Sequence, residues 1–168
     1  MFCFQCQETA KGTGCTIQGV CGKKAETSRW QDLLLAVTRG VATISDSLRN
    51  AGVKTSQEVG DYIVDALFAT ITNANFDDQS ILNKVDNGLR IKRELIELAK
   101  KNNVELPNYQ EVTWGGEKAD YEAEGNREGV LRTENEDLRS LKELTILGLK
   151  GMAAYYEHAS RLNERNEE

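Results

Sequence analysis

Residues 27–48 have the sequence TSRWQDLLLAVTRGVATISDSL, and this stretch decides the fold class. Its large apolar side chains recur at spacings of three and four, the period that places them on one face of an α-helix. These side chains are Trp30, Leu34, Val37, Val41, Ile44 and Leu48. Gly52 follows as a stop signal. The stretch therefore predicts an amphipathic helix.

Two further stretches have the same helical period. Thr55, with Glu58 three residues later, has the pattern of a capping box and predicts a helix that ends near residues 73–75. Apolar residues also recur after Asp77, which we expect to cap a third helix. That helix cannot continue past Pro107, because proline lacks a backbone N–H.

The C-terminal part of the chain divides into two segments. Glycines interrupt residues 108–132, which predicts loops or short helical pieces there. From Thr133, which forms a second capping-box pattern with Glu136, the sequence predicts a long helix. Gly148 and Gly151 lie inside it and predict close approach of a neighbouring helix, because each costs about 1 kcal/mol against alanine. Strand signals are nearly absent, so the sequence predicts an all-α, up-and-down helical bundle.

The 168-residue chain is long enough to bury a core without cross-links. We expect one domain, in which a loop of residues 1–24 is attached to a helical bundle of residues 25–168. The formal net charge of −6 gives no electrostatic reason to bind nucleic acid or an anionic membrane surface, so neither is expected as a partner. No stretch approaches the roughly 18 apolar residues of a membrane span, and the first residues lack the order of a signal peptide. We therefore expect a cytoplasmic protein.

All four cysteines lie in the first 21 residues, within the stretch MFCFQCQETAKGTGCTIQGVCGK of residues 1–23. They are Cys3, Cys6, Cys15 and Cys21, and the gaps between successive cysteines are two, eight and five residues long. The short first gap lets two sulfurs point into one turn, and the longer gaps let the loop wrap around to complete four-fold ligation. Four thiolates select zinc or an iron–sulfur cluster over a hard cation.

Three kinds of site fit four clustered cysteines. Two disulfides suit a small secreted domain, and that context is absent here. A structural zinc site is the stronger alternative, because four cysteines satisfy zinc completely. However, zinc sites commonly use a second C-x2-C or C-x2-H pair, whereas five residues separate the last two cysteines.

An iron–sulfur cluster is favoured by the composition of the loop. Its many glycines and small polar residues allow backbone N–H groups to turn towards cluster sulfurs. Apolar residues alternate with them and could shield a cluster from water, namely Phe2, Phe4, Ile17 and Val20. The spacing and the composition together favour iron–sulfur, with zinc as the alternative.

The cysteine loop and three later stretches resemble the N-terminal region of the hybrid cluster protein family, also known as the prismane protein or hydroxylamine reductase family. The later stretches are QDLLLAVTRG (31–40), LFATITNANFD (67–77) and TENEDLRSLKELTILGLKGMAAYYEHA (133–159). The resemblance covers nearly the whole chain and is weakest at about residues 102–132. It implies a cytoplasmic redox enzyme whose helical N-terminal domain holds a conventional cluster, which passes electrons to a mixed iron, sulfur and oxygen hybrid cluster.

Carried over by position, the resemblance makes Cys3, Cys6, Cys15 and Cys21 the ligands of the conventional cluster. Their spacing is similar to the branch of the family that carries [4Fe-4S], whereas a branch with longer spacing carries [2Fe-2S]. The hybrid cluster of the longer family members is held by residues downstream of the matched region. We therefore expect these 168 residues to contain no catalytic residue and not to reduce hydroxylamine alone.

The same comparison predicts the partners of the chain. Family members are much longer, and the last predicted helix remains periodic to Leu162 and ends on charge, so we expect a fragment of a longer reductase. Its expected partner is the remainder of the reductase chain or a redox donor protein. The alternative is a structural zinc module or a partner-docking domain with no redox role.

Five other side chains have simpler explanations. His158, the only histidine, lies on a predicted helix and receives no role. Tyr155 and Tyr156 could lie on an electron path, but an aromatic pair at helical positions usually belongs to the core. Gln5 and Gln7 are expected either to hydrogen-bond near the cluster or to serve the folding of the loop.

Overall fold

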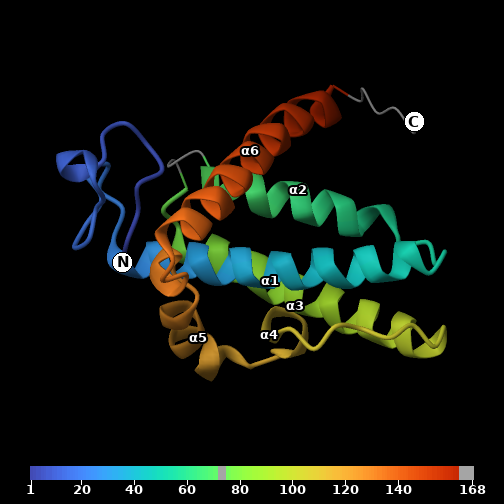
Figure 1. The fold of residues 1–168 in the computed structure, drawn as a ribbon. Coiled ribbons are helices and arrows are strands. Elements are labelled where there is room, and N and C mark those ends of the chain that lie inside the picture. The colour runs from blue at the N-terminus through green and yellow to red at the C-terminus, as the bar shows by residue number, and fades with distance from the viewer. Residues whose placement is uncertain (72–74, 163–168) are drawn as a thin grey trace.

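The computed structural model describes residues 1–71 and 75–162. Within these residues the chain forms helices joined by loops and no β-strand, which confirms the all-α class (Figure 1). The long helices are α1 (Ala25–Asn50), α2 (Gln57–Ile71), α3 (Asp78–Lys101) and α6 (Glu136–Arg161). In Figure 1, α1 and α3 run from left to right and α2 runs back above α1, so consecutive long helices alternate in direction as expected of an up-and-down bundle.

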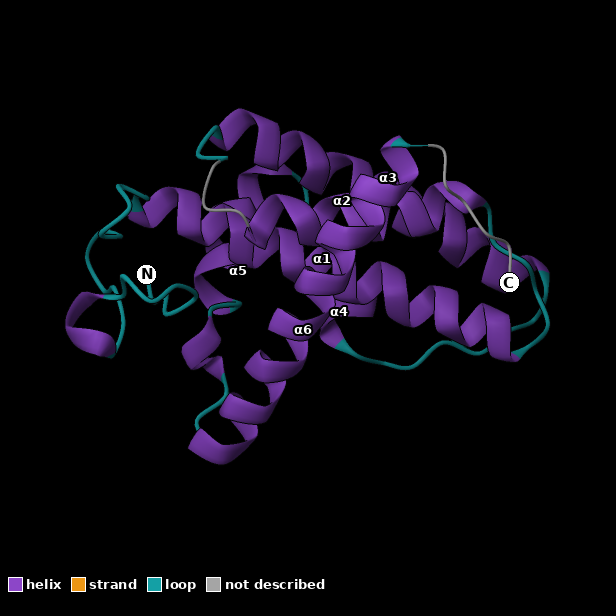
Figure 2. Cartoon of the chain, turned by 90° about the horizontal axis from the view of Figure 1, so that it is seen from above, coloured by secondary structure: helices purple, strands orange, loops and turns teal. Residues whose placement is uncertain are grey.

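The core lies where α1 packs against α3 and α2, the arrangement seen from above in Figure 2. All six apolar residues that defined the helical period of residues 27–48 are buried, and they meet apolar residues of the two neighbouring helices. The main contributions from α2 and α3 are Val59, Tyr62, Ala66, Ile81, Val85, Leu89, Ile91 and Leu95. The period of three and four therefore identified the buried face of α1 correctly.

Two predicted helix boundaries are confirmed. Helix α1 ends at Asn50, and Gly52 follows with a φ of 75°, a left-handed conformation that suits glycine. Asp77 caps α3, since its carboxylate accepts hydrogen bonds from the backbone N–H groups of Gln79 and Ser80.

The other two helix starts differ from the prediction. Helix α2 begins at Gln57, two residues after Thr55, and its predicted end near residues 73–75 is only partly testable because 72–74 lie outside the described residues. Helix α6 begins at Glu136 and is capped by Asn135, whose side chain accepts a hydrogen bond from the Leu138 N–H. The capping box predicted at Thr133 is therefore wrong, because a better-placed Asn lies closer to the first helical turn.

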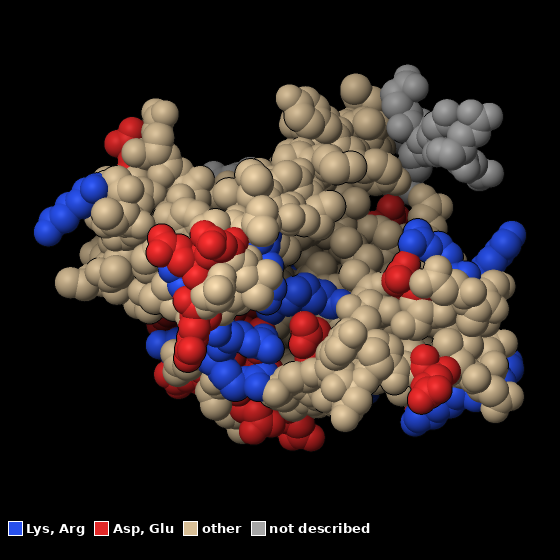
Figure 3. All heavy atoms as spheres, viewed as in Figure 1, with Lys and Arg blue, Asp and Glu red and all other residues tan. Residues whose placement is uncertain are grey.

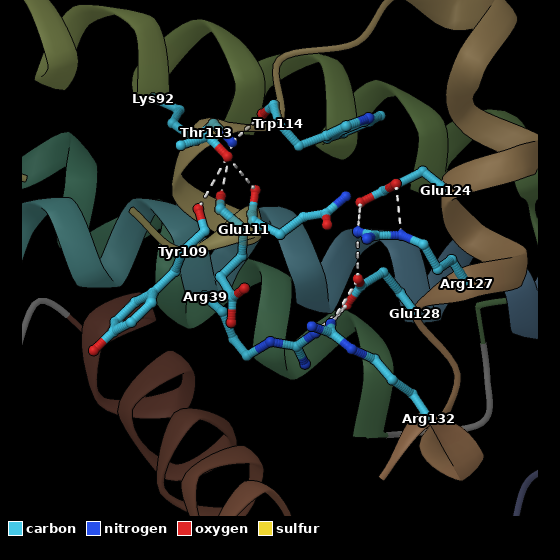
Figure 4. A network of polar contacts seen from close by, with 11 residues as sticks. Arg39, Lys92, Tyr109, Glu111, Thr113, Trp114, Glu124, Arg127, Glu128 and Arg132 are labelled. Carbon is cyan, nitrogen blue, oxygen red and sulfur yellow. Dashed lines mark hydrogen bonds and ion pairs between the residues drawn. The ribbon is translucent and has the colours of Figure 1, made fainter. Parts of the chain in front are cut away.

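Residues 108–132 form the short pieces that the glycine pattern predicted. They include α4 (Gln110–Thr113) and α5 (Tyr121–Arg127), with 3₁₀ turns before and after α5. A buried carboxylate, Glu128, holds this segment to α1 by accepting hydrogen bonds from Arg39, Arg127 and Arg132 (Figure 4). A charge-assisted network thus replaces regular secondary structure as the support of this segment.

Helix α6 lies across α2 and leaves much of its apolar surface exposed (Figure 1). No described atom outside the helix lies within 4 Å of a Cβ built on Gly148 or Gly151, so the predicted close helix approach at these glycines is wrong. Tyr155 is 83% exposed and Tyr156 is also exposed, so the expectation of a core aromatic pair is wrong as well. Most of the large apolar side chains of α6 therefore face solvent in this chain, whereas Ala153 is buried.

Charged side chains are unevenly distributed over the face shown in Figure 3. Acidic and basic groups alternate over the lower half, whereas the region at the top, where the C-terminal part of α6 lies, is mostly uncharged. None of the helices that the structure describes has the length and apolarity needed to cross a bilayer.

Candidate metal centre

The cysteine loop precedes α1 and folds back on itself. Cys3 and Cys15 lie opposite each other in an isolated antiparallel bridge, in which the Cys3 N–H donates to the Cys15 carbonyl at 3.1 Å and the Cys15 N–H donates to the Cys3 carbonyl at 2.8 Å. A 3₁₀ turn, Ala10–Gly12, reverses the chain between them. The backbone thus places the first and third cysteines side by side, although twelve positions separate them in sequence.

Glycines give the loop its tight turns. Gly12 and Gly22 have φ values of 68° and 90°, conformations that side chains with a Cβ rarely adopt. At Gly19, a Cβ would lie 3.0 Å from the Cys21 sulfur and 3.1 Å from the Lys23 Cβ. The absence of a side chain there leaves room for the Cys21 thiol beside the backbone.

Cys15 is buried, and backbone N–H groups point at its sulfur. The Ala10 N–H donates to Sγ at 3.5 Å, and the hydrogen bonds from the Ala10 and Val20 N–H groups lower the pKa of the thiol. Burial acts in the opposite direction and the nearby charge of Lys23 adds to the lowering. This environment favours a thiolate, the form of cysteine that binds metals.

The donor set fits an iron–sulfur cluster. All four cysteines are free thiols, and the N–H groups directed at Cys15 are of the kind that tune such clusters. Among residues 1–71 and 75–162, no three His, Cys, Asp or Glu side chains converge as they would around a single ion. Four thiolates are a complete ligand set for an iron–sulfur cluster and also for zinc, so the donor set alone does not choose between them.

The predicted apolar shield is present on one side only. Phe2 and Phe4 pack with ring centroids 5.6 Å apart, and Phe2 lies against Gly14. Ile17 is 86% exposed and Val20 is also exposed, so the expectation that they cover the site is wrong for this chain.

Gln5 fastens the loop to the bundle. Its Nε2 donates to the carbonyls of Thr70 and Ile71 at 3.0 and 2.7 Å, and its Oε1 accepts a hydrogen bond from Lys150 Nζ at 3.0 Å. One side chain between Cys3 and Cys6 thereby joins the end of α2 to α6. Of the two roles expected for this glutamine, the structure supports the folding of the loop, while Gln7 is exposed.

A buried group of charges lies behind Cys3 and was missed by the sequence interpretation. Lys23 Nζ lies 3.9 Å from Cys3 Sγ, and a cavity of about 50 Å³ is lined by Cys3, Lys23, Asp32 and Lys150 among others. Burial raises the pKa of Asp32 to about 7 and lowers that of Lys150 to about 8. The only signal in the sequence is the position of Lys23 directly after the last cysteine turn.

The chain matches the model of the Prismane/CO dehydrogenase family over residues 1–168. It is 52% identical over 169 residues to a hydroxylamine reductase of Bacteroides fragilis (strain YCH46), covering 100% of this chain and 30% of that protein. A hydroxylamine reductase of Porphyromonas gingivalis is 50% identical over 100% of the chain and 31% of its own length. One of Nitratidesulfovibrio vulgaris is 44% identical, again over 100% of the chain and 32% of its own length. The chain thus spans about a third of the length of these curated relatives.

Proposed function

This chain belongs to the Prismane/CO dehydrogenase family, and from that membership we propose that it is the electron-relay part of a hydroxylamine reductase. In this proposal Cys3, Cys6, Cys15 and Cys21 hold one [4Fe-4S] cluster. When it is bound, this cluster accepts and donates one electron at a time. The residues that reduce hydroxylamine, or a related nitrogen oxide, lie in the part of the reductase outside these 168 residues, where the longer members hold the hybrid cluster.

The single observation that carries the proposal is the environment of the four thiols. They occur in one loop as free cysteines, and the sulfur of Cys15 accepts backbone N–H hydrogen bonds although it is buried. A buried sulfur surrounded by N–H donors is poised as a thiolate ligand, and the family match makes an iron–sulfur cluster the group that fits. A cytoplasmic location is consistent with this role, because thiols stay reduced there.

Each part of the loop has a function in this proposal. The bridge between Cys3 and Cys15 fixes two ligands relative to each other, and Gly19 leaves space beside Cys21. Gln5 fixes the segment between Cys3 and Cys6 to α2 and α6, so the ligands are positioned by the rigid bundle. Electron transfer needs little movement of its ligands, and a loop supported in this way provides that rigidity.

The partner in this proposal is the remainder of the reductase. About two thirds of each relative's length lies outside the aligned region, and α6 presents an exposed apolar surface that includes Leu144, Met152 and Tyr155. Large exposed apolar surfaces mark interaction sites. We therefore assign this surface of α6 as the contact with the reductase portion that receives the electrons.

The decisive experiment is anaerobic purification of the 168-residue chain followed by iron, zinc and acid-labile sulfide analysis. The proposal expects iron and sulfide in equal amounts, about four of each per chain, and a visible absorption band that dithionite bleaches. A colourless protein with one zinc per chain and no labile sulfide would reject it. That result would instead identify the loop as a structural zinc module.

The ligand assignment is tested by Cys6→Ser, with Thr16→Ser in the same loop as the control. Cys6→Ser is expected to lose or convert the cluster, because a hydroxyl is a poor substitute for a thiolate. Thr16 is exposed and is not a ligand in this assignment, so its variant should keep the iron content of the wild type. Unchanged iron in Cys6→Ser would show that Cys6 is not a ligand.

A further inference from the structure

Lys23 is a buried lysine beside a cysteine sulfur. Lys23 is only 2% exposed, and its Nζ lies 3.9 Å from Cys3 Sγ. Among the residues that the structure describes, no carboxylate forms an ion pair with this ammonium, and Cys3 Sγ is its hydrogen-bonding partner. The next residue, Lys24, is exposed.

This placement becomes more favourable when the sulfur carries negative charge, because Asp32 lines the same cavity but forms no ion pair with Lys23. Burying an ammonium without a counter-charge costs several kcal/mol, and a neutral thiol is only a weak acceptor. A cluster held by four thiolates carries a net negative charge, which grows by one unit when the cluster accepts an electron. The position of Lys23 therefore suits an anionic group on Cys3, and suits its reduced state more than its oxidised state.

We propose that Lys23 is a positioning residue that raises the reduction potential of the group held by Cys3, Cys6, Cys15 and Cys21. The inference rests on the proposed function and deepens it. The step involved is the transfer of one electron from a low-potential donor, with no bond formed or broken and no proton moved. Lys23 stabilises the charge added in that step, because its ammonium is fixed beside a ligand sulfur and shielded from water.

The surroundings of Lys23 make its charge effective. The cavity behind Cys3 is also lined by Gln31 and Asp32, and at about 50 Å³ it has room for only a few water molecules. A charge in such a cavity is screened far less than one at the surface. Asp32 has the opposite charge and lines the same cavity, so it should counteract Lys23.

The test is a spectroelectrochemical titration of the iron-loaded 168-residue chain at pH 8, where Asp32, with a pKa of about 7, is ionised. Lys23→Met and Lys23→Gln are compared with the control Lys24→Met, which removes the same charge one residue away at the surface. We expect both Lys23 variants to lower the ratio of reduced to oxidised cluster about tenfold at a fixed potential, equivalent to 59 mV for one electron. Lys24→Met should shift the ratio less than twofold, because water screens an exposed charge.

Two further variants separate charge from shape. Asp32→Asn is nearly isosteric and should shift the potential upwards, opposite to the Lys23 variants. Lys23→Arg keeps the charge and should keep both the iron content and a potential close to that of the wild type. The neutral Lys23 variants could fail to bind iron. In that case, iron bound by Lys23→Arg would still support a role of the charge, and a Lys23→Arg variant without iron would overturn the inference.

The outcomes distinguish this inference from the proposed function. A wild-type chain without iron and sulfide would reject both. A wild-type chain with a reducible cluster, whose potential is the same in Lys23→Met and in Lys24→Met, would overturn the role of Lys23 and leave the electron-relay proposal intact. A downward shift in Asp32→Asn would also overturn it, because the charges of the cavity would then not act by electrostatics.

Discussion

Lys92 shows how one buried side chain holds a segment that has little regular structure. It is 2% exposed, and its Nζ donates to the backbone carbonyls of Glu111, at 2.8 Å, and Trp114 (Figure 4). The ammonium also lies 6.0 Å from the centre of the Trp114 ring. Because α4 is only one turn long, these contacts and not helix formation fix its position on α1 and α3.

Lys92→Met should therefore lower the free energy of unfolding by about 2 kcal/mol at pH 7, because two buried carbonyls lose their donor. Urea unfolding followed by circular dichroism measures this loss. Lys101→Met, on the exposed end of the same helix, is the control and should change stability by less than about 0.5 kcal/mol. Equal stabilities for the two variants would show that Lys92 does not support α4.

The same lysine gives the stability a defined pH dependence. Burial lowers the pKa of Lys92 to about 8, whereas the unfolded chain has a value of 10.5. Between these values the unfolded state binds more protons than the native state, so stability rises with pH. The difference between wild type and Lys92→Met should thus grow by about 1–3 kcal/mol from pH 8 to 10.5. A difference that stays constant over this range would contradict the lowered pKa.

At the residue scale, the sequence pointed to the candidate ligands but not to the side chains that support them. Cysteine is rare and its spacing can be read directly, so Cys3, Cys6, Cys15 and Cys21 were apparent as a set. Lys150 contacts Gln5 across 145 positions, and no local pattern marks such a contact. Lys23 contacts Cys3 across 20 positions, and only its place after the last cysteine turn points to it. Both side chains are charged and buried, which is the opposite of what their residue type predicts.

Between elements, two glycines in helices should respond to alanine in opposite directions. A Cβ at Gly88 in α3 would overlap the Tyr62 side chain of α2 and lie 2.7 Å from Val37 Cγ1 of α1. Gly88→Ala should therefore destabilise the bundle by about 2 kcal/mol or more through overpacking. A Cβ at Gly60 in α2 would have no described neighbour within 4 Å. Gly60→Ala should therefore raise the free energy of unfolding by about 0.5–1 kcal/mol. Denaturant unfolding of both variants tests the close packing of α1, α2 and α3. Equal changes in unfolding free energy for Gly88→Ala and Gly60→Ala would contradict it.

The apolar surface of α6 should make the isolated chain self-associate. The triple variant Leu144→Gln, Met152→Gln and Tyr155→Gln removes exposed apolar groups while keeping good helix formers. Sedimentation velocity should show a shift towards monomer with the unfolding free energy unchanged within about 0.5 kcal/mol. Thr145→Gln, at an exposed polar site of the same helix, is the control. A loss of several kcal/mol in the triple variant would show that these side chains support the bundle.

At the scale of elements, periodicity predicted the helices whose partners are present and misjudged α6. For α1 and α3 the apolar face is also the buried face. In α6 the same kind of period leaves Leu144 and Tyr155 exposed, because a period identifies a face but not the element that covers it. The start of α6 was misplaced for a local reason, since Thr133 and Asn135 are both good caps and only the fold decides between them.

Over the whole molecule, the cysteine loop and the hydrophobic core are separate structures. The core cluster begins at Trp30 and includes no residue of the loop. In Figure 1 the loop extends beyond the ends of the helices, and it is tied to them by polar side chains such as Gln5. Four cysteines in a single loop were readable from the sequence, but this lateral attachment depends on contacts between distant segments and was not.

This separation predicts a partial response to removal of the bound metal. Treatment of the loaded chain with a chelator and an oxidant should leave the far-ultraviolet circular dichroism nearly unchanged, because the helices do not depend on the loop for their core. Trypsin should then cut faster after the exposed Lys11 and Lys24, since metal binding supplies folding energy to such loops. The matched control is Arg161, exposed at the end of α6, where the rate of cleavage should not change. A parallel loss of helicity would show instead that the loop and the bundle fold as one unit, and that the group held by the cysteines stabilises the entire chain.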